Sequence, residues 1–290
     1  MSYNALEEIV RECREKDLPF DEVILLDDMN ERNVKREESL HSMEGMWDAM
    51  KRADRSYDGK LKSRSGLVGG AGDAMKAYVE SGKALCGSFV GEVMASALAM
   101  GESNACMKRI VAAPTAGACG VLPAVLVNYQ KRNETSDEEI VRALYTAAGI
   151  GQVVAARAYI AGASGGCQAE IGTASAMAAG ALTALRGGTP EQITHAAALA
   201  LKNLLGLVCD PVGGLVEVPC VKRNVIGSVN ALSAADMALA GITSRIPPDQ
   251  VIDAMREVGD QMHPTLRETG QGGLANTPAA REWCAAQEEE

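Results

Sequence analysis

Three cysteines beside turn-forming residues are the side chains of this sequence best suited to chemistry. Cys167 lies in GASGGCQAEIG, Cys209 in GLVCDPVGG and Cys220 in VEVPCVKRN. The neighbouring glycines and prolines predict loops and helix ends, where backbone N–H groups are free to donate to a thiolate or sulfide. Three thiolates at such positions could bind an anionic metal cluster.

Spacing alone leaves a simpler alternative open. No CxxC pair occurs in the chain, and free cysteines often serve as small buried hydrophobic residues. Cys119, in TAGACG, could line a pocket or simply pack as a small side chain. We treat Cys13, Cys86 and Cys106 as structural.

Charge and composition exclude several classes of function. Lys and Arg total 28 against 38 Asp and Glu, a formal net charge of -10, which argues against nucleic acid or an anionic membrane as partners. The first twenty residues carry charges throughout and lack the apolar core of a signal peptide. Glu92 and Arg157 interrupt the most apolar stretches, so no membrane span is predicted. We expect a cytoplasmic protein with reduced thiols.

The elements that must position the cysteines are predicted to be helices. Aromatic residues make up only 3% of the chain, whereas Ala, Gly and Met abound, which suits closely approaching helices. Two capping boxes predict helix starts, Ser136 with Glu139 and Thr189 with Gln192. A third helix should bury one face, formed by Val90, Val93, Met94, Ala97 and Leu98.

Strands are scarce, and the fold class is predicted to be all-α. The best alternation is GLVEVPCV, which Pro219 restricts to an edge or a loop, and no parallel sheet is expected. Residues 1–61 are charged and helical in pattern and are interpreted as a solvated N-terminal arm. Residues 62–290, rich in Gly, Ala and Ser, should form one compact multi-helix domain with Gly-rich connecting loops.

Four stretches lie in unbroken order between about Lys62 and Thr277. They are KSRSGLVGGAGDAM, APTAGACGVLPAVL, GASGGCQAEIGTASAMAAG and DPVGGLVEVPCVKRN. Together they closely resemble the α-chain of bacterial iron–sulfur L-serine dehydratases. The contexts of the three cysteines are the most specific part of the resemblance.

The resemblance implies a cofactor and a reaction. Cys167, Cys209 and Cys220 would hold a [4Fe–4S] cluster and leave one iron without a protein thiolate. Such an iron can act as a Lewis acid on the β-hydroxyl of L-serine, which is converted to pyruvate and ammonia. No pyridoxal phosphate is required, and sensitivity to oxygen is expected. Cys284 is a candidate resting-state ligand, because some relatives close their cluster with a C-terminal cysteine.

Two Gly-rich loops are predicted to form the substrate pocket. Hydroxyl and amide groups of Ser63, Ser65 and Gly66 could bind the substrate carboxylate, and the alternative is a plain helix–helix turn. The same choice applies to a second loop, formed by Thr115, Ala116 and Gly117.

The proton-abstracting base has two candidates. One is Lys222, two residues beyond Cys220, if burial lowers its pKa. The other is Ser65 as an alkoxide.

Other functions remain open on the sequence. A related L-cysteine desulfidase would use similar cluster chemistry, and a non-enzymatic cluster-bearing sensor or a helical interaction module is the alternative of another class. Relatives often carry a further β-type region, so a separate β-subunit is the expected partner, with a higher oligomer also open.

Overall fold

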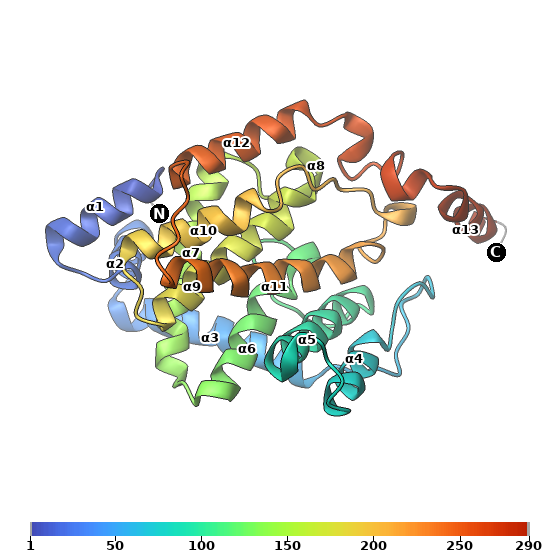
Figure 1. The fold of residues 1–290 in the computed structure, drawn as a ribbon, viewed down its shortest axis with the longest axis horizontal. Coiled ribbons are helices and arrows are strands. Elements are labelled where there is room, and N and C mark those ends of the chain that lie inside the picture. Colours follow the sequence, from blue (N-terminus) through green and yellow to red (C-terminus); the bar gives the residue numbers. More distant parts are fainter. Residues whose placement is uncertain (1, 289–290) are drawn as a thin grey trace.

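The computed structural model describes residues 2–288 as helices joined by loops (Figure 1). The α-helices in chain order are α1 (Leu6–Lys16), α2 (Phe20–Arg32), α3 (Arg36–Arg55), α4 (Ala71–Glu80), α5 (Gly87–Ala105), α6 (Val121–Asn133), α7 (Asp137–Arg157), α8 (Gly162–Gly165), α9 (Thr173–Leu185), α10 (Pro190–Lys202), α11 (Cys220–Leu239), α12 (Pro248–Gln261) and α13 (Pro278–Glu288). Short turns are the π-helical η2 (Gln168–Gly172) and the 3-10 turns η1 (Ala116–Ala118), η3 (Val212–Gly214), η4 (Pro264–Leu266) and η5 (Gly273–Asn276).

The predicted all-α class is confirmed. Among residues 2–288 the only β-type pairing is an isolated bridge between Cys209 and Arg267. The segment GLVEVPCV forms a loop that runs into α11, because Pro219 stands directly before its first helical residue. A helix with the length and apolarity of a bilayer span does not occur in the described part of the chain.

Both predicted helix starts are found. Ser136 is the N-cap of α7: its Oγ accepts from the Glu139 N–H at 3.2 Å, and the Glu139 carboxylate accepts from the Ser136 N–H at 2.9 Å. Thr189 and Gln192 repeat the arrangement at the start of α10, with distances of 3.3 and 2.9 Å. The free amides of both first turns are therefore partly satisfied by neighbouring side chains.

Helix α9 is the centre of the molecule. It packs against α6, α7, α10 and α11. Its sequence TASAMAAGALTAL has no charge, and every residue from 173 to 183 is buried, as expected for a helix covered on all sides. A Cβ at Gly180 would lie 2.1 Å from Cδ1 of Ile150 on α7. Small side chains therefore let helices approach closely without aromatic residues.

Glycines also fix the start of α11. A Cβ at Gly101 of α5 would lie 3.1 Å from the Cα of Val221, and one at Gly227 of α11 would lie 2.8 Å from Val121 of α6. The first turn of α11, which begins at Cys220, therefore packs closely against α5, and a later turn packs against α6. The apolar face predicted for α5 is confirmed in part: Val93, Ala97 and Leu98 are buried, while its other two members are half-buried.

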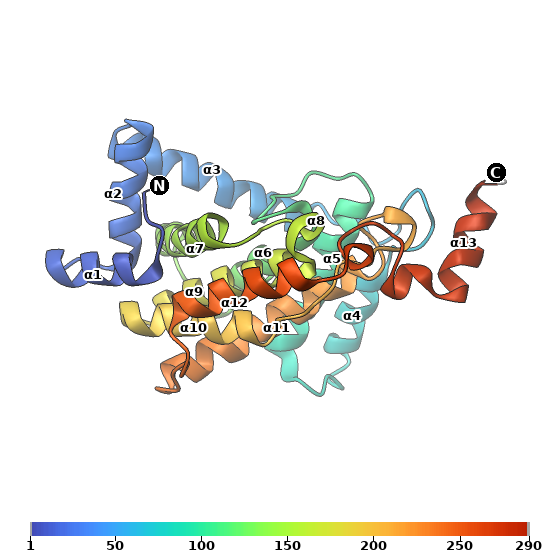
Figure 2. The same ribbon diagram turned by 90° about the horizontal axis from the view of Figure 1, so that it is seen from above.

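The N-terminal helices pack on the body. Helices α1 and α2 lie at one end of the molecule and α13 at the other (Figures 1 and 2). Ile24 and Phe20 of α2 are buried against Gly149 of α7, and Trp47 of α3 is only 1% exposed. The division at residue 61 stays a prediction, since one apolar core contains side chains from both sides of it.

Replacing Ile24 tests this shared core. Ile24→Ala should lower the free energy of unfolding by about 2–5 kcal/mol, because it leaves a cavity beside Gly149. Met46→Ala, on the exposed face of α3, should change it by less than about 0.5 kcal/mol. Urea unfolding followed by circular dichroism and Trp fluorescence measures both. An equally small effect of the two variants would show that α1–α3 fold apart from the body.

Candidate active site

The three predicted cysteines are all buried and lie at element ends. Cys167 directly precedes η2, which leads into α9, and Cys220 is the first residue of α11. Cys209 lies in an extended segment after α10, where its N–H donates to Leu266 O at 2.8 Å and its carbonyl accepts from the Glu268 N–H at 2.7 Å. Their exposed fractions are 3%, 3% and 9% for Cys167, Cys209 and Cys220.

The three thiols are close enough to influence one another. Burial is the main cause that raises the pKa of Cys167 to about 12 and that of Cys220 to about 11. Burial also raises the pKa of Cys209, with further contributions from Cys167 and Cys220. Without a bound cation these groups stay protonated, so they are suited to bind metal only when the metal itself supplies the positive charge.

One half-buried cation accompanies the thiols. The Arg223 guanidinium lowers the pKa of Cys167 and Cys220 against the effect of burial. It donates to Val208 O at 2.6 Å and to Asp210 Oδ1 at 2.8 Å. Asp210 is 3% exposed, and its Oδ2 accepts from the Leu274 N–H at 2.7 Å. The ion pair is therefore fixed at the segment that carries Cys209.

Glu170 is a site residue that the sequence analysis missed. It lies on η2, three residues beyond Cys167, and its Oε1 accepts from the Thr115 hydroxyl at 2.6 Å. A Cβ at Gly117 would lie 3.1 Å from Oε1, and one at Gly162 would lie 2.9 Å from Oε2 and 2.7 Å from the Cys209 Sγ. Two glycines thus leave space around this carboxylate and beside a predicted ligand.

A signal for Glu170 was present in the sequence. It is the only charged residue between Arg157 and Arg186. Burial is the main cause that raises its pKa above the usual range, and the Thr115 hydrogen bond opposes the shift. Glu170 also raises the pKa of all three cysteines. A lone acid in an apolar run directly after a motif cysteine therefore indicates a buried carboxylate near the site.

The second predicted loop is joined to the cysteines by Asn224 of α11. Its Nδ2 donates to Gly117 O at 2.9 Å and to Cys220 O at 3.0 Å, and its Oδ1 accepts from the Gly120 N–H at 2.8 Å. Thr115 and Gly117 therefore lie together with Glu170 near Cys220. Ala116 lies at the same turn and is exposed.

The first predicted loop is held by a different buried acid. Ser63 and Ser65 both donate to Glu217 Oε2, at 2.7 and 2.5 Å, and their hydroxyls are 3.0 Å apart. Glu217 is 6% exposed and precedes Cys220 by three residues. Gly66 is exposed at the tip of this loop. The two serines are thereby tied to the segment that leads into α11.

The amides at the end of the same loop are already paired. Glu102 of α5 accepts from the N–H groups of Gly69, Ala71 and Gly72 at 2.9–3.2 Å and from the Tyr57 hydroxyl at 2.6 Å. These donors belong to the free N-terminus of α4, and the buried carboxylate caps them. Of the other predicted groups in this loop, the Gly66 N–H donates to Ser63 O at 2.9 Å, and the hydroxyls of Ser63 and Ser65 donate to Glu217.

The burial that would allow Lys222 to act as the base is not found. Lys222 is exposed on α11. Two residues along a helix turn a side chain by about 200°, so Lys222 faces away from the side that carries Cys220. Arg223 and Asn224, which lie three and four residues beyond Cys220, face the site instead. Lys222 therefore lacks the burial that would favour a neutral amine able to accept a proton.

Two other cysteines differ in their surroundings. Cys119 is buried and its Sγ donates to Met100 O at 3.7 Å. Cys284 of α13 is half-buried, with its Sγ 3.7 Å from where a Cβ of Gly213 would lie. Gly213 belongs to the segment between Cys209 and Cys220. Within residues 2–288, no three His, Cys, Asp or Glu side chains meet at a point that could hold a single metal ion.

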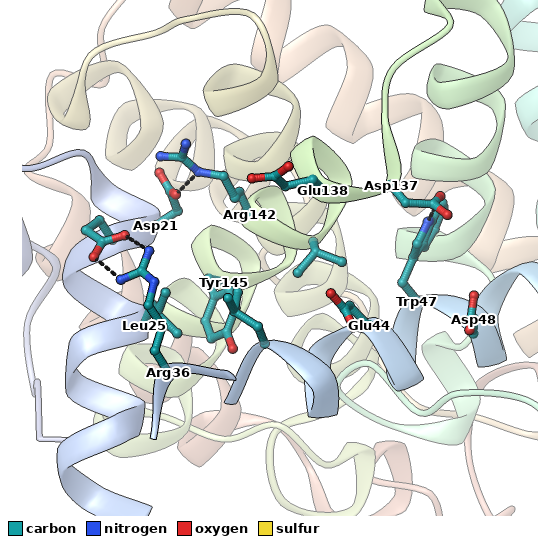
Figure 3. A pocket seen from close by; sticks show the side chains of 13 residues that line it. Asp21, Leu25, Arg36, Glu44, Trp47, Asp48, Asp137, Glu138, Arg142 and Tyr145 are labelled. Carbon is teal, nitrogen blue, oxygen red and sulfur yellow. Dashed lines mark hydrogen bonds and ion pairs between the residues drawn. The ribbon is translucent and has the colours of Figure 1, made fainter. Parts of the chain in front are cut away.

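A separate cleft of ≈ 500 Å³ lies between α2, α3 and α7 (Figure 3). Its lining includes none of the predicted site residues. Two of its acidic side chains form ion pairs with arginines. Arg142 donates to Asp21 at 2.6 Å, and both terminal guanidinium nitrogens of Arg36 donate to Glu22, at 2.5 and 2.8 Å. These ion pairs join α2 to α7 and α3, so the charged residues of the cleft hold the three helices together.

Known proteins resemble nearly the whole chain. The family model described as serine dehydratase alpha chain matches residues 11–275. A protein named "Probable L-serine dehydratase, alpha chain" from Bacillus subtilis is 47% identical over 280 residues, 97% of this chain and 93% of that one. An L-serine dehydratase alpha chain from Peptoniphilus asaccharolyticus is 42% identical over 94% of each chain. An L-serine dehydratase from Escherichia coli is 48% identical over 62% of this chain and 40% of its own length.

Replacing Glu102 tests the capping role assigned to it. Glu102→Gln should lower the free energy of unfolding by about 1–3 kcal/mol, because an amide cannot accept from all the N–H donors of the α4 terminus. Tyr57→Phe removes one donor and leaves the carboxylate in place, so about 0.5–1.5 kcal/mol is expected. Thermal and urea unfolding measure both. A glutamine variant as stable as wild type would mean that the carboxylate does not hold the loop.

Proposed function

This chain belongs to the serine dehydratase alpha chain family, and from that premise we propose that it is the catalytic chain of an iron–sulfur L-serine dehydratase. The reaction is the elimination of water from L-serine, followed by hydrolysis to pyruvate and ammonia. The observation that carries the proposal is the set of three buried thiols, of which Cys220 raises the pKa of Cys167 and both of these raise the pKa of Cys209.

We propose that Cys167, Cys209 and Cys220 hold a [4Fe–4S] cluster. Burial disfavours the thiolate form of each, so a bound cation is needed to stabilise it, and iron would supply that charge. The missing Cβ of Gly162 leaves space beside the Cys209 sulfur. A cluster takes each thiolate on a separate iron, so its ligands need not converge as they do around one ion. The donor set therefore fits such a group.

The bound cluster would supply a Lewis-acidic iron for the substrate hydroxyl. For removal of the Cα proton we propose Ser65, because its hydroxyl already donates to the buried Glu217 carboxylate. Glu217 would take the hydroxyl proton while the Ser65 oxygen accepts the proton from Cα. Ser63, which shares Glu217, keeps the loop in place, and exposed Lys222 is disfavoured as the base.

Other groups complete the proposed pocket. Gly66, Thr115, Ala116 and Gly117 are retained with Ser63 and Ser65 as the substrate-binding set, supported by the hydrogen bonds that tie both loops to α11. Cys284 is retained as a candidate resting-state ligand, supported by its place beside Gly213.

We propose a β-type chain as the protein partner. The relatives from Bacillus subtilis and Peptoniphilus asaccharolyticus, which match over nearly their full length, are both named alpha chains. The Escherichia coli dehydratase has most of its length outside the match. A second chain would supply the part that the longer relative carries in one polypeptide.

Serine substitutions test the cluster. Cys167→Ser, Cys209→Ser and Cys220→Ser should each lower bound iron and sulfide after anaerobic purification. Each should also lower L-serine turnover by more than about a hundredfold, because loss of a ligand costs at least as much as loss of a group that supports one. Cys13→Ser, a buried cysteine on α1, should keep both. Wild-type protein without iron or sulfide would instead favour a helical interaction module.

Assays with two amino acids test the substrate. The anaerobic enzyme, with its β-type partner where turnover requires it, should prefer L-serine to L-cysteine and lose activity in air. Mössbauer spectra with and without L-serine should change at one iron only. A clear preference for L-cysteine would replace the proposed reaction with a desulfidase reaction, and full turnover by the chain alone would remove the need for a partner.

A further inference from the structure

We propose that the Glu170 carboxylate binds the α-ammonium group of the amino-acid substrate. This inference rests on the proposed function and adds a recognition site to it. An amino acid brings one positive and one negative group into the pocket. The two predicted loops offer hydroxyls and amides for the negative group. Glu170 is the acid placed to receive the positive one.

The backbone aims Glu170 into the site. The chain turns from Cys167 into α9 through the π-helical η2, and such turns in helices often occur at functional positions. Thr115 fixes Oε1 at 2.6 Å, while Oε2 receives no hydrogen bond from residues 2–288. An acceptor with one oxygen held and the other available is suited to bind a donor from a ligand.

The space around Oε2 is made by glycine. A Cβ at Gly162 would lie 2.9 Å from Oε2, and one at Gly117 would lie 3.4 Å from the carboxylate carbon. A side chain at either position would fill the approach to the carboxylate. A ligand at Gly162 would lie beside the Cys209 sulfur as well, because the same Cβ position is 2.7 Å from it.

The charge balance calls for a cation at this point. Glu170 has no ion-pair partner within the described residues, since Arg223, the cation among the thiols, bonds Asp210. Glu170 raises the pKa of Cys167, Cys209 and Cys220. Glu268 in turn raises the pKa of Glu170. An ammonium group would relieve both effects, because a half-buried carboxylate is stabilised by an opposite charge within hydrogen-bond distance.

The test compares two inhibitors that each lack one part of serine. L-alanine keeps the ammonium group and lacks the hydroxyl, whereas 3-hydroxypropionate keeps the hydroxyl and lacks the ammonium group. In the anaerobic holoenzyme, Glu170→Gln should raise the KM for L-serine and the Ki for L-alanine by about 10- to 100-fold, the range for a hydrogen bond to a charged group. The Ki for 3-hydroxypropionate should stay the same or fall.

Two further variants control for charge and folding. Glu170→Asp keeps the negative charge, so it should keep the preference for L-alanine even if both inhibitors bind more weakly. Glu268→Gln makes the same charge change at an exposed position near the thiols, and its KM should change by less than about threefold. Bound iron is measured for every variant and should equal that of wild type.

The outcomes separate this inference from the proposed function. Wild type without iron or L-serine turnover would overturn the proposed function itself. With an active wild type, a Glu170→Gln variant that loses iron would make Glu170 a structural residue and overturn the inference. A fall in kcat with unchanged KM and unchanged inhibitor preference would make it a proton acceptor, which also overturns the inference.

Discussion

The burial of three sulfur groups in an otherwise apolar interior is the constraint on which the rest of the structure depends. A charged group in such surroundings is costly unless an opposite charge or hydrogen-bond donors accompany it. Arg223 is placed among the thiols for this reason, and Asp210 fixes Arg223 in turn. The small side chains of α9 and the glycines of α5 and α11 allow helices close enough to enclose the group.

Buried carboxylates organise the loops around the thiols. Glu102 holds the start of α4, Glu217 holds Ser63 and Ser65, and Asp210 holds Arg223 together with the Leu274 amide. Each acid accepts from groups far away in the chain, so each loop has a defined shape although it is rich in glycine. The excess of acids over bases therefore serves the interior as well as the surface.

Local patterns in the sequence predicted local structure well. The two capping boxes and the turn positions of the three cysteines depend on neighbours within a few residues, and they were identified correctly. The roles of Glu102 and Glu217 could not be recognised, because their hydrogen-bond partners are distant in sequence. A buried acid cannot be told from an exposed one by residue type alone. Lys222 shows the opposite error: nearness along a helix was taken for nearness in space.

The core membership of the N-terminal helices was hidden for a related reason. Charged residues dominate the composition of residues 1–61, whereas the residues that pack, such as Ile24 and Trp47, are few and widely spaced. The number of charged residues reflects the solvent-exposed faces of these helices and does not reveal their buried faces. Their contacts with α7 show that they belong to the core.

The three thiols reach one place only after distant parts of the chain have docked. One precedes the central helix, one stands in an extended segment paired with residues near 267, and one opens α11. A zinc finger can fold around its ion because its ligands lie close together in sequence. Under the proposed function, by contrast, no short stretch of this chain contains the complete ligand set, so the cluster would be inserted only after the segments that carry Cys167, Cys209 and Cys220 have come together.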